Sequence, residues 1–335
     1  MGKLVRKIMA ATESSLPVLR MFDRLGSRPN GRRIIRLLFC WIGLFRVIGG
    51  IFSSCRKKSA PDCALAVAAI VKNEAPYLNE WISYHIRIGV GKFYIFDNDS
   101  TDCTRELLQP LIAEGRVVYH RLSGKQRQID AYNLALRQYG RLHRYIAMID
   151  LDEFIYVTDG KRLVDRLDDF FEMYPNAGGC ALNWAIFGSS GYREKPDGLV
   201  TQTYLHRSVQ DFPKNRHIKT VCIPERVWGF PNPHYAVYRR RYGAFTFSGE
   251  RVEGAMSNTV DWSSVRLNHY FTKSYSEFLE KRSRGMADNA DIRAISDFEA
   301  HDINDVSDAG MTGAWDLDGG GEDVRRDGAE DVEPR

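Results

Sequence analysis

The sequence predicts an α/β fold in which a mainly parallel, doubly wound sheet is flanked by helices. Apolar runs of strand length alternate with amphipathic stretches of helical length from about residue 64 onward. Such alternation is typical of parallel strands, because each helix carries the chain back to the start of the next strand. Acidic residues also follow several of the apolar runs, and open α/β sheets bind their ligands at the carboxyl ends of strands.

Each predicted element has a local signal. The run 64–71 is apolar throughout, as expected of a strand that is buried on both faces. Pro76 suits the first turn of a helix, and the glycines at 89 and 91 suit its end. In order, we expect strands at 64–71, 92–96, 116–121 and along 145–154, and helices at 77–88, 103–113, within 124–140 and at 275–290.

Length and composition allow one large folded domain or two modest ones. The 335 residues are 44% hydrophobic and 12% aromatic, which supports a substantial core and excludes a globally disordered chain. The six cysteines are scattered without CxxC spacing, so neither a zinc site nor a disulfide scaffold is indicated, and a reduced compartment is the simpler interpretation. The sequence lacks the glycine motifs of dinucleotide-binding folds and P-loop NTPases.

Charge is distributed unevenly, although the formal net charge is only +4. We predict a basic amino-terminal extension at 1–62, a folded catalytic region at 63–300, and an acidic, Gly-rich tail at 301–335 that is disordered. Local patches of this kind say more about partners than the average charge does.

The segment 34–52 is the most apolar in the chain, with charges on both sides and Arg46 inside it. A membrane span needs about 20 apolar residues, and an arginine at the membrane centre costs roughly 2.5 kcal/mol or more. A helix that lies on an anionic membrane surface therefore fits better than a single-pass span. The alternative that 34–52 is a helix packed into the protein core is not excluded. A nucleic-acid-binding role is disfavoured because the segment is apolar.

The run 145–154 ends in three carboxylates within four positions. Asp150 and Asp152 are two residues apart, so they point to the same side of an extended chain and can share a divalent cation. Hard oxygen ligands suit Mn²⁺ or Mg²⁺, and both ions accept phosphate oxygens as further ligands. The alternative is a strand end followed by a helix cap, since an isolated Asp-x-Asp is common.

Carboxylates recur after the other predicted strands. Glu74 follows the first strand, and Asp97 and Asp99 follow the second. If parallel strands bring these ends to one edge of the sheet, the cleft there carries more negative charge than a protein keeps without a cation or hydrogen-bond donors. The pattern therefore favours a site for a metal and a nucleotide diphosphate over the plain strand end.

Several stretches together resemble nucleotide-sugar glycosyltransferases with the GT-A fold, specifically family 92 and the related family 2. The resemblance covers about residues 64–285 in a single catalytic domain, with 63–155 as the nucleotide-sugar half and 156–300 as the acceptor half. The matching stretches are 71–74 with 80–81 and 84–85, 96–102, 149–154, 183–184 with 187–191, 219–224, 233–235, and 268–274 with Phe278, Lys281 and 284–285.

The resemblance implies a UDP-sugar donor and a Mn²⁺ or Mg²⁺ ion. In such folds Asp150 and Asp152 form the DxD motif, with Asp152 as the main metal ligand and His269 as a third ligand or a diphosphate contact. The uridine and ribose would be lined by Asn73, Glu74 and Asp97, and Asp99, Lys125 and Arg127 are further residues expected to bind the nucleotide. An interfacial histidine with satisfied hydrogen bonds is the alternative role for His269.

The chemistry of glycosyl transfer suits these residue types. Negative charge builds on the departing diphosphate, and a divalent cation stabilises it as a Lewis acid. The cationic candidates to assist are Lys125, Arg127, Lys219 and Lys273.

An inverting enzyme, which the resemblance favours, also needs a base for the attacking hydroxyl. The pattern does not single out a base among the candidates Asp211, Glu250 and Glu253. The aromatic-rich region 175–270 is the expected site for the glycosyl acceptor, with Trp184, as the best candidate for an exposed aromatic, and His234 as its contacts. Most of the aromatic residues there are expected to form core.

We therefore expect a metal-dependent glycosyltransferase that moves a sugar to a glycan or glycolipid acceptor, in the synthesis of a surface polysaccharide or glycoconjugate. We expect it on the cytoplasmic face of a membrane, held peripherally through 34–52 and without a nucleic-acid partner. The alternative is an inactive transferase fold that serves as a scaffold at the membrane.

Overall fold

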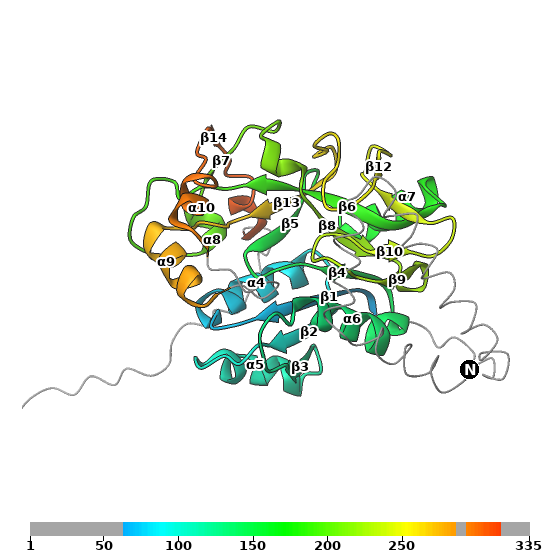
Figure 1. Ribbon diagram of the computed structural model, residues 1–335, viewed down its shortest axis with the longest axis horizontal. Helices are drawn as coiled ribbons and strands as arrows, with labels where there is room; N and C mark the ends of the chain where they lie inside the picture. Colours follow the sequence, from blue (N-terminus) through cyan, green and yellow to red (C-terminus); the bar gives the residue numbers. More distant parts are fainter. Residues whose placement is uncertain (1–62, 286–292, 316–335) are drawn as a thin grey trace, which may run out of the picture.

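The computed structural model describes residues 63–285 and 293–315. These residues form a layered α/β structure in which helices cover both faces of one large sheet (Figure 1). The expected apolar helix at 34–52 and the rest of the extension 1–62 lie outside the described residues. Among the described helices, none has the length and apolar character needed to cross a membrane.

The first half of the domain is a parallel sheet in the order β4-β1-β2-β3. Its elements follow each other in strict strand–helix alternation, as predicted. They are β1 (Cys63–Val71), α4 (Ala75–Arg87), β2 (Lys92–Asp97), α5 (Thr104–Ala113), β3 (Val117–Arg121), α6 (Gln128–Tyr139), the 3-10 turn η1 (Gly140–Leu142) and β4 (His143–Met148).

The side chains of β1 show why the sheet is covered on both faces. Leu65 and Val67, like every second residue, pack in one core with α4, α5 and α7, while Ala66 and Ala68 pack in another core with α6. Because all of these strand residues are apolar, neither face can be left in water. The predicted doubly wound α/β arrangement is confirmed.

The second half extends the same sheet with a mixture of strand directions. β8 runs antiparallel between β4 and β6, and β13 joins β6 in parallel and β5 in antiparallel orientation. The larger elements are β5 (Glu153–Val157), α7 (Leu163–Met173), β6 (Ala177–Ile186), α8 (Val200–Thr203), β8 (Ile218–Cys222), β11 (Gly243–Phe245), β12 (Arg251–Val252), β13 (Val265–His269), α9 (Tyr275–Ser283) and α10 (Ile295–Glu299). The small elements are β7 (His206–Arg207), η2 (Pro213–Arg216), η3 (Pro224–Arg226), β9 (Val227–Gly229), β10 (Val237–Tyr238), β14 (Val306–Ser307) and η4 (Thr312–Trp315).

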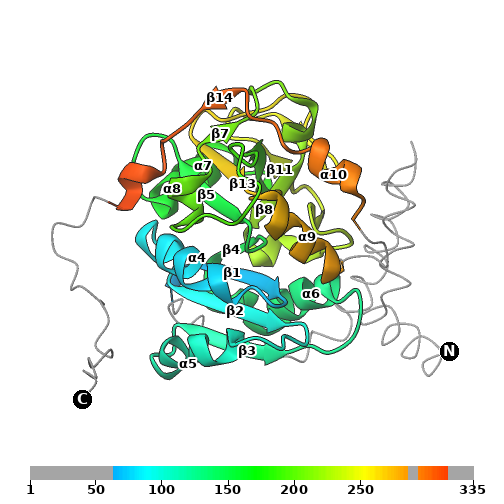
Figure 2. The same ribbon diagram turned by 90° about the vertical axis from the view of Figure 1, so that its left-hand side faces the viewer.

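Helix α9 lies beside the carboxyl end of β1, although about 200 residues separate them (Figure 2). Its start is fixed by a capping box, in which Ser274 and Glu277 satisfy each other's backbone N–H groups. Arg284, at its end, donates to the carbonyl of Asn73 at 2.5 Å. The helix therefore projects side chains from the end of the domain into the nucleotide-sugar half.

The predicted tail is wrong over residues 301–315, which belong to the folded domain. β14 pairs with β7, and Met311 is 2% exposed in the main core. Asp308 forms ion pairs with Arg207 and Arg266. Composition suggested disorder because the segment carries few apolar residues, but paired charges and strand addition hold it instead. Residues 316–335 lie outside the described residues.

Candidate active site

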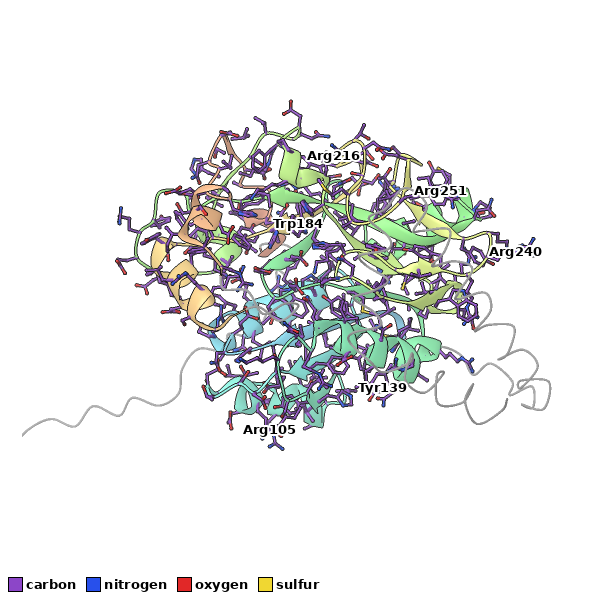
Figure 3. All side chains as sticks on the ribbon, in the orientation of Figure 1. Arg105, Tyr139, Trp184, Arg216, Arg240 and Arg251 are labelled. Carbon is purple, nitrogen blue, oxygen red and sulfur yellow. The ribbon has the colours of Figure 1, made fainter. Side chains whose placement is uncertain are left out.

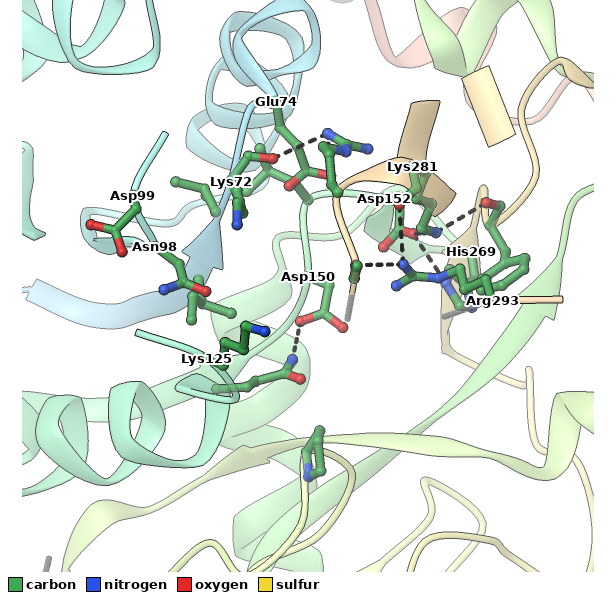
Figure 4. A pocket seen from close by; sticks show the side chains of 18 of the residues that line it. Lys72, Glu74, Asn98, Asp99, Lys125, Asp150, Asp152, His269, Lys281 and Arg293 are labelled. Carbon is green, nitrogen blue, oxygen red and sulfur yellow. Dashed lines mark hydrogen bonds and ion pairs between the residues drawn. The ribbon is translucent and has the colours of Figure 1, made fainter. Parts of the chain in front are cut away.

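A cleft of about 690 Å³ opens at the carboxyl ends of β1, β2 and β4 (Figure 4). This is the sheet edge that strand order predicts for a ligand. The polar and charged side chains that line it are Lys72, Glu74, Asn98, Asp99, Lys125, Gln128, Asp150, Asp152, Lys219, His234, His269, Lys281, Ser283, Arg284 and Arg293, with Trp184 and Phe271 among the aromatic ones. The cleft thus gathers Glu74, Asp99, Asp150 and Asp152, as predicted from their positions after the strands.

Asp150 is held by three neutral or cationic donors. Its Oδ1 accepts hydrogen bonds from Gln128 at 2.7 Å and from the Tyr132 hydroxyl at 2.9 Å, and its Oδ2 lies 2.7 Å from Lys219 Nζ. Burial works against ionisation, but Lys219 outweighs it and lowers the pKa of Asp150. Asp150 is therefore a charged side chain whose charge the protein itself balances.

Asp152 lies deeper, with 6% of its surface exposed. Its Oδ2 accepts a hydrogen bond from Lys281 and lies 3.5 Å from His269 Nε2. Burial opposes its charge, yet Lys281 and His269 hold the pKa of Asp152 well below its usual range. Figure 4 shows Asp152, His269 and Lys281 together on one side of the cleft, with Asn98 and Asp99 on the other.

Glu74 is balanced less completely than the two aspartates. Its Oε1 lies 3.6 Å from Arg284 Nη1. Burial raises the pKa of Glu74, and Arg284 offsets this only in part. A cationic or hydrogen-bonding group of a ligand would therefore find Glu74 as an available partner.

Glu153, which follows the DxD motif, is fully buried behind the cleft. Its Oε1 accepts from the Trp184 indole at 2.7 Å, and its Oε2 accepts from the backbone N–H of Asp150 at 2.8 Å. Burial raises the pKa of Glu153 to about 8, against the opposing effect of Lys219. These bonds fix the turn between β4 and β5, so Glu153 sets the direction in which Asp150 and Asp152 point.

The charge balance of the cleft differs from the prediction of an excess of negative charge. Four carboxylates line it, but six lysine and arginine side chains do so as well. Lys219 comes from β8 and Lys281 from α9, so the compensating charges arrive from parts of the chain far from the DxD motif. The cleft is suited to an anionic ligand even before any metal ion is considered.

Three residues predicted to bind the nucleotide do not line the cleft. Asp97 accepts from the backbone N–H of Ser100 and the Tyr119 hydroxyl, so it stabilises the turn after β2. The side-chain oxygen of Asn73 accepts from the Thr101 backbone, and Arg127 forms an ion pair with Asp130 at 2.9 Å. Local hydrogen bonds and an ion pair thus use the polar atoms of these residues, and their contact with a nucleotide stays a prediction.

Asp99 and Lys125 do line the cleft, at its outer side. The Asp99 carboxylate also accepts from the Ser123 hydroxyl and the Gly124 backbone. Lys273, a further cationic candidate, instead lies 4.2 Å from the centre of the Tyr77 ring and outside the cleft lining. Lys219, by contrast, is in the cleft, as predicted.

None of the three proposed bases lines the cleft. Glu250 accepts hydrogen bonds from the backbone of Asn258 and Thr259, which shapes a surface loop. Glu253 is exposed and lies 3.8 Å from Arg251, and Asp211 is exposed as well. Sequence order placed these carboxylates after the DxD motif, but it could not tell which side of the sheet they occupy.

Trp184 and His234 both line the cleft, as expected of contacts to a glycosyl acceptor. The prediction that Trp184 is exposed is wrong: its exposed fraction is 9%, and Figure 3 shows it near the middle of the molecule. Its ring packs against His217, His234 and His269 while its N–H is bonded to Glu153. Trp184 nevertheless belongs to the cleft lining.

His234 presents a fixed hydrogen-bonding face. Its Nδ1 lies 3.0 Å from the carbonyl oxygen of Ile218, and a carbonyl can only accept, so Nδ1 carries the proton. Burial and the nearby Lys219 lower the pKa of His234 to about 3, so the ring is neutral. Its Nε2 has no partner among the described residues and is left as an acceptor.

Sequence reasoning missed three cationic residues of the cleft. Lys281, Arg284 and Arg293 come from α9 and the segment after it. Helical spacing places Lys281 and Arg284 on the same side of α9, which is a signal that they act together. The sequence held no signal for what that side of the helix faces.

Asp152 and His269 suit a divalent cation by their chemistry, although Lys281 contacts one oxygen of Asp152, whereas both oxygens of Asp150 have partners. The His269 Nδ1 is buried without a partner, and burial lowers the pKa of His269, so a neutral imidazole is available as a ligand. Within residues 63–285 and 293–315, the three predicted ligands Asp150, Asp152 and His269 do not form a ready-made cluster. The donor set fits Mn²⁺ or Mg²⁺ if phosphate oxygens complete it.

Comparison with known proteins places the chain in a family. The family description glycosyltransferase family 92 matches residues 63–297, so the chain belongs to glycosyltransferase family 92. The expected α/β fold of a glycosyltransferase domain is thereby confirmed together with the resemblance.

Plant proteins are among its relatives. A glycosyltransferase family 92 protein of Oryza sativa subsp. japonica is 31% identical over 234 residues, which cover 69% of this chain and 37% of the relative. One from Ricinus communis is 29% identical over 48% of this chain and 29% of its own length. A galactan beta-1,4-galactosyltransferase of Arabidopsis thaliana is 29% identical over 31% of this chain and 22% of its own length. The matched part of the chain thus covers 37% or less of the length of each of these relatives.

Similar solved structures include S. aureus TarS, with a TM-score of 0.37 and 11% identity over 65% of this chain and 64% of that one. The mannosyltransferase PcManGT from Pyrobaculum calidifontis, in complex with GDP-Man and Mn²⁺, has a TM-score of 0.27 and 17% identity over 49% of this chain and 47% of that one.

Proposed function

We propose that the protein is a metal-dependent glycosyltransferase that transfers a sugar from a UDP-sugar to a hydroxyl of a glycan or glycolipid, with inversion. The observation that carries this proposal is the cleft of a family 92 domain in which Asp150 and Asp152 meet a set of lysines and arginines at the strand ends. Carboxylates beside cations suit the diphosphate of a nucleotide-sugar, because they can hold both a cation and the phosphate oxygens.

The donor side of the reaction uses residues of both halves. Asp152 and His269 would hold the divalent cation, which supplies Lewis-acid stabilisation of the leaving diphosphate. Lys125 and Arg293 line the same cleft and can bind phosphate oxygens, which lowers the cost of the charge that develops on them, whereas Lys219 acts through Asp150. Glu153 keeps the DxD turn in place.

The acceptor side would use Trp184 and His234, which line the same cleft. Trp184 offers an apolar surface for a sugar ring, and the unprotonated Nε2 of His234 can accept a hydrogen bond from the attacking hydroxyl. Since the cleft lining contains no carboxylate from the acceptor half among the described residues, His234 is the side chain that we propose orients this hydroxyl.

The test is transfer or hydrolysis of a panel of UDP- and GDP-sugars with Mn²⁺ by the wild type, Asp152→Asn and Asp211→Asn. We expect turnover with a UDP-sugar, a loss of about 100-fold or more in Asp152→Asn, and no change in the Asp211→Asn control, because Asp211 is exposed outside the cleft. Calorimetry with UDP and Mn²⁺ distinguishes the alternative: an inactive scaffold would show neither turnover nor metal-dependent UDP binding.

We also propose peripheral attachment to the cytoplasmic face of a membrane through 34–52, in the synthesis of a surface glycan. The support is the basic and apolar composition of that segment. Sedimentation of the full chain with anionic and with neutral liposomes tests it, and equal retention on both would contradict an electrostatic contribution.

A further inference from the structure

The ammonium of Lys281 contacts the carboxylate of Asp152, which is the side chain that a metal ion would need. Lys281 is 8% exposed, its Nζ donates to Asp152 Oδ2, and it also donates to the carbonyl oxygen of Phe271 at 3.0 Å. The ammonium lies 4.0 Å from the centre of the Phe271 ring, which adds a cation–π contact. Arg293 donates to the Lys281 backbone carbonyl at 3.3 Å. Lys281 is therefore held in a defined position by several groups.

The ammonium and a divalent cation compete for the same oxygen. Asp152 Oδ2 already accepts a hydrogen bond from Lys281 and lies 3.5 Å from His269 Nε2. A metal ion held by Asp152 and His269 would therefore lie next to a buried ammonium. Like charges at such a separation repel strongly in a poorly solvated site, so both cannot remain there.

We propose that Lys281 is a resident cation of the nucleotide-free protein, which leaves Asp152 when metal and nucleotide bind together and then pairs with the donor diphosphate. This inference rests on the proposed function, because it concerns the same donor site. It explains how a buried Asp152 stays charged and ready without a bound metal.

The charges of the cleft imply that this exchange needs the nucleotide. Six lysine and arginine side chains already face four carboxylates, so a divalent cation alone enters a site with an excess of positive charge. A diphosphate brings negative charge for both the metal ion and the released Lys281. Metal and nucleotide should therefore strengthen each other's binding, and by linkage they do so by the same factor.

The experiment measures Mn²⁺ binding to the full chain by electron paramagnetic resonance, with and without UDP. In the wild type we expect weak Mn²⁺ binding alone and binding at least about tenfold tighter with UDP. In Lys281→Met we expect Mn²⁺ alone to bind about tenfold tighter than in the wild type, because Asp152 Oδ2 is free, while the gain on adding UDP shrinks. Lys161→Met is the control for loss of a lysine, since Lys161 is exposed and outside the cleft lining, so Mn²⁺ and UDP should bind to this variant as they do to the wild type.

Two results would overturn the inference. One is a folded Lys281→Met variant that binds Mn²⁺ alone no tighter than the wild type does. The other needs no variant: wild-type Mn²⁺ affinity that is unchanged by UDP. If UDP binding by the wild type depends on Mn²⁺ while Lys281→Met behaves like wild type, the proposed function stands and only the role of Lys281 fails; if the wild type shows no Mn²⁺-dependent UDP binding, the metal-dependent function fails as well.

Discussion

Lys219 Nζ lies 2.7 Å from Asp150 Oδ2, across the antiparallel pairing of β8 with β4. The same ammonium lies 3.5 Å from Glu153 Oε2. Lys219 is 1% exposed, and the two carboxylates and the ring of Tyr132 surround it. A single buried cation thus serves both the DxD motif and the carboxylate that positions it.

Replacing Lys219 should therefore lower the free energy of unfolding as well as impair the site. Lys219→Met would leave the partly exposed Asp150 without its cation and would remove a buried group beside Glu153, and breaking such a half-buried ion pair should cost about 2 kcal/mol, less than the roughly 3–5 kcal/mol of a fully buried one. The measurement is urea unfolding at neutral pH. Lys125→Met serves as the comparison, because Lys125 is exposed and its loss should change the free energy of unfolding by less than about 0.5 kcal/mol. Equal stabilities of the two variants would contradict the assigned role.

Much of the first half of the fold was predictable because its signals are local. A strand that is buried on both faces needs apolar residues throughout, and the run 64–71 has them. Parallel strands bring their carboxyl ends to one edge of the sheet, so the sequence alone predicts that Glu74, Asp150 and Asp152 lie in one cleft. The role of Asp97 could not be predicted in this way, because its carboxylate accepts a hydrogen bond from the Ser100 backbone and so stabilises the turn after β2.

The remainder of the site depends on contacts between distant parts of the chain. Lys281 reaches Asp152 across 129 residues, and no periodicity of either stretch records that α9 covers the strand ends. The same holds for Trp184, which is buried because β6 lies inside the sheet, paired with β8 and β13. Composition also misjudged residues 301–315, since it does not register ion pairs.

The fixed tautomer of His234 leads to a kinetic prediction. His234→Ala should lower kcat by about 10–100-fold with little change in UDP affinity, because Nε2 is the atom that we propose accepts a hydrogen bond from the attacking hydroxyl. Acceptor-dependent kinetics and UDP calorimetry are the two measurements. His217→Ala, which removes the neighbouring ring from Trp184 but does not line the cleft, should affect kcat less. A drop in UDP affinity that accounts for the whole loss would rule out an acceptor-side role.

His85 makes stability depend on pH. It is fully buried, and burial lowers the pKa of His85 to about 3 from the usual 6.5. In the unfolded chain His85 takes up a proton below about pH 6.5, whereas in the folded protein it stays neutral down to about pH 3. The free energy of unfolding therefore falls as the pH drops between these values. Between about pH 7 and pH 5.5 this group alone should remove about 1 kcal/mol.

The variant His85→Gln isolates this contribution. A glutamine can still bond to the Trp81 carbonyl, which accepts from His85 at 2.8 Å, but it does not titrate. Urea unfolding of both proteins at the two pH values should show a shallower loss for the variant, whatever its absolute stability. Parallel pH dependence in the two proteins would mean that His85 is not the group responsible.

The carboxylate of Asp308 holds the carboxyl-terminal part of the described structure against the core. Its Oδ2 lies 2.5 Å from Arg207 Nε and 2.8 Å from Arg266 Nη2, and all three side chains are largely buried. Burial opposes the charge, but the two guanidinium groups keep the pKa of Asp308 below its usual range. The segment is thus attached by an ion-pair network of three residues and by the pairing of β14 with β7.

Asp308→Asn should therefore cost about 3 kcal/mol in the free energy of unfolding, because it leaves two largely buried guanidinium groups without a counter-charge. Asp305→Asn is the matched control: Asp305 is exposed and accepts a single hydrogen bond, from the Val209 backbone at 3.3 Å, so its loss should cost less than about 1 kcal/mol. If the segment contributed nothing to stability, both variants would be as stable as the wild type in urea unfolding. A large loss for Asp308→Asn with little loss for Asp305→Asn is the pattern that only a structural ion-pair network produces, since both substitutions remove one negative charge from the same acidic segment.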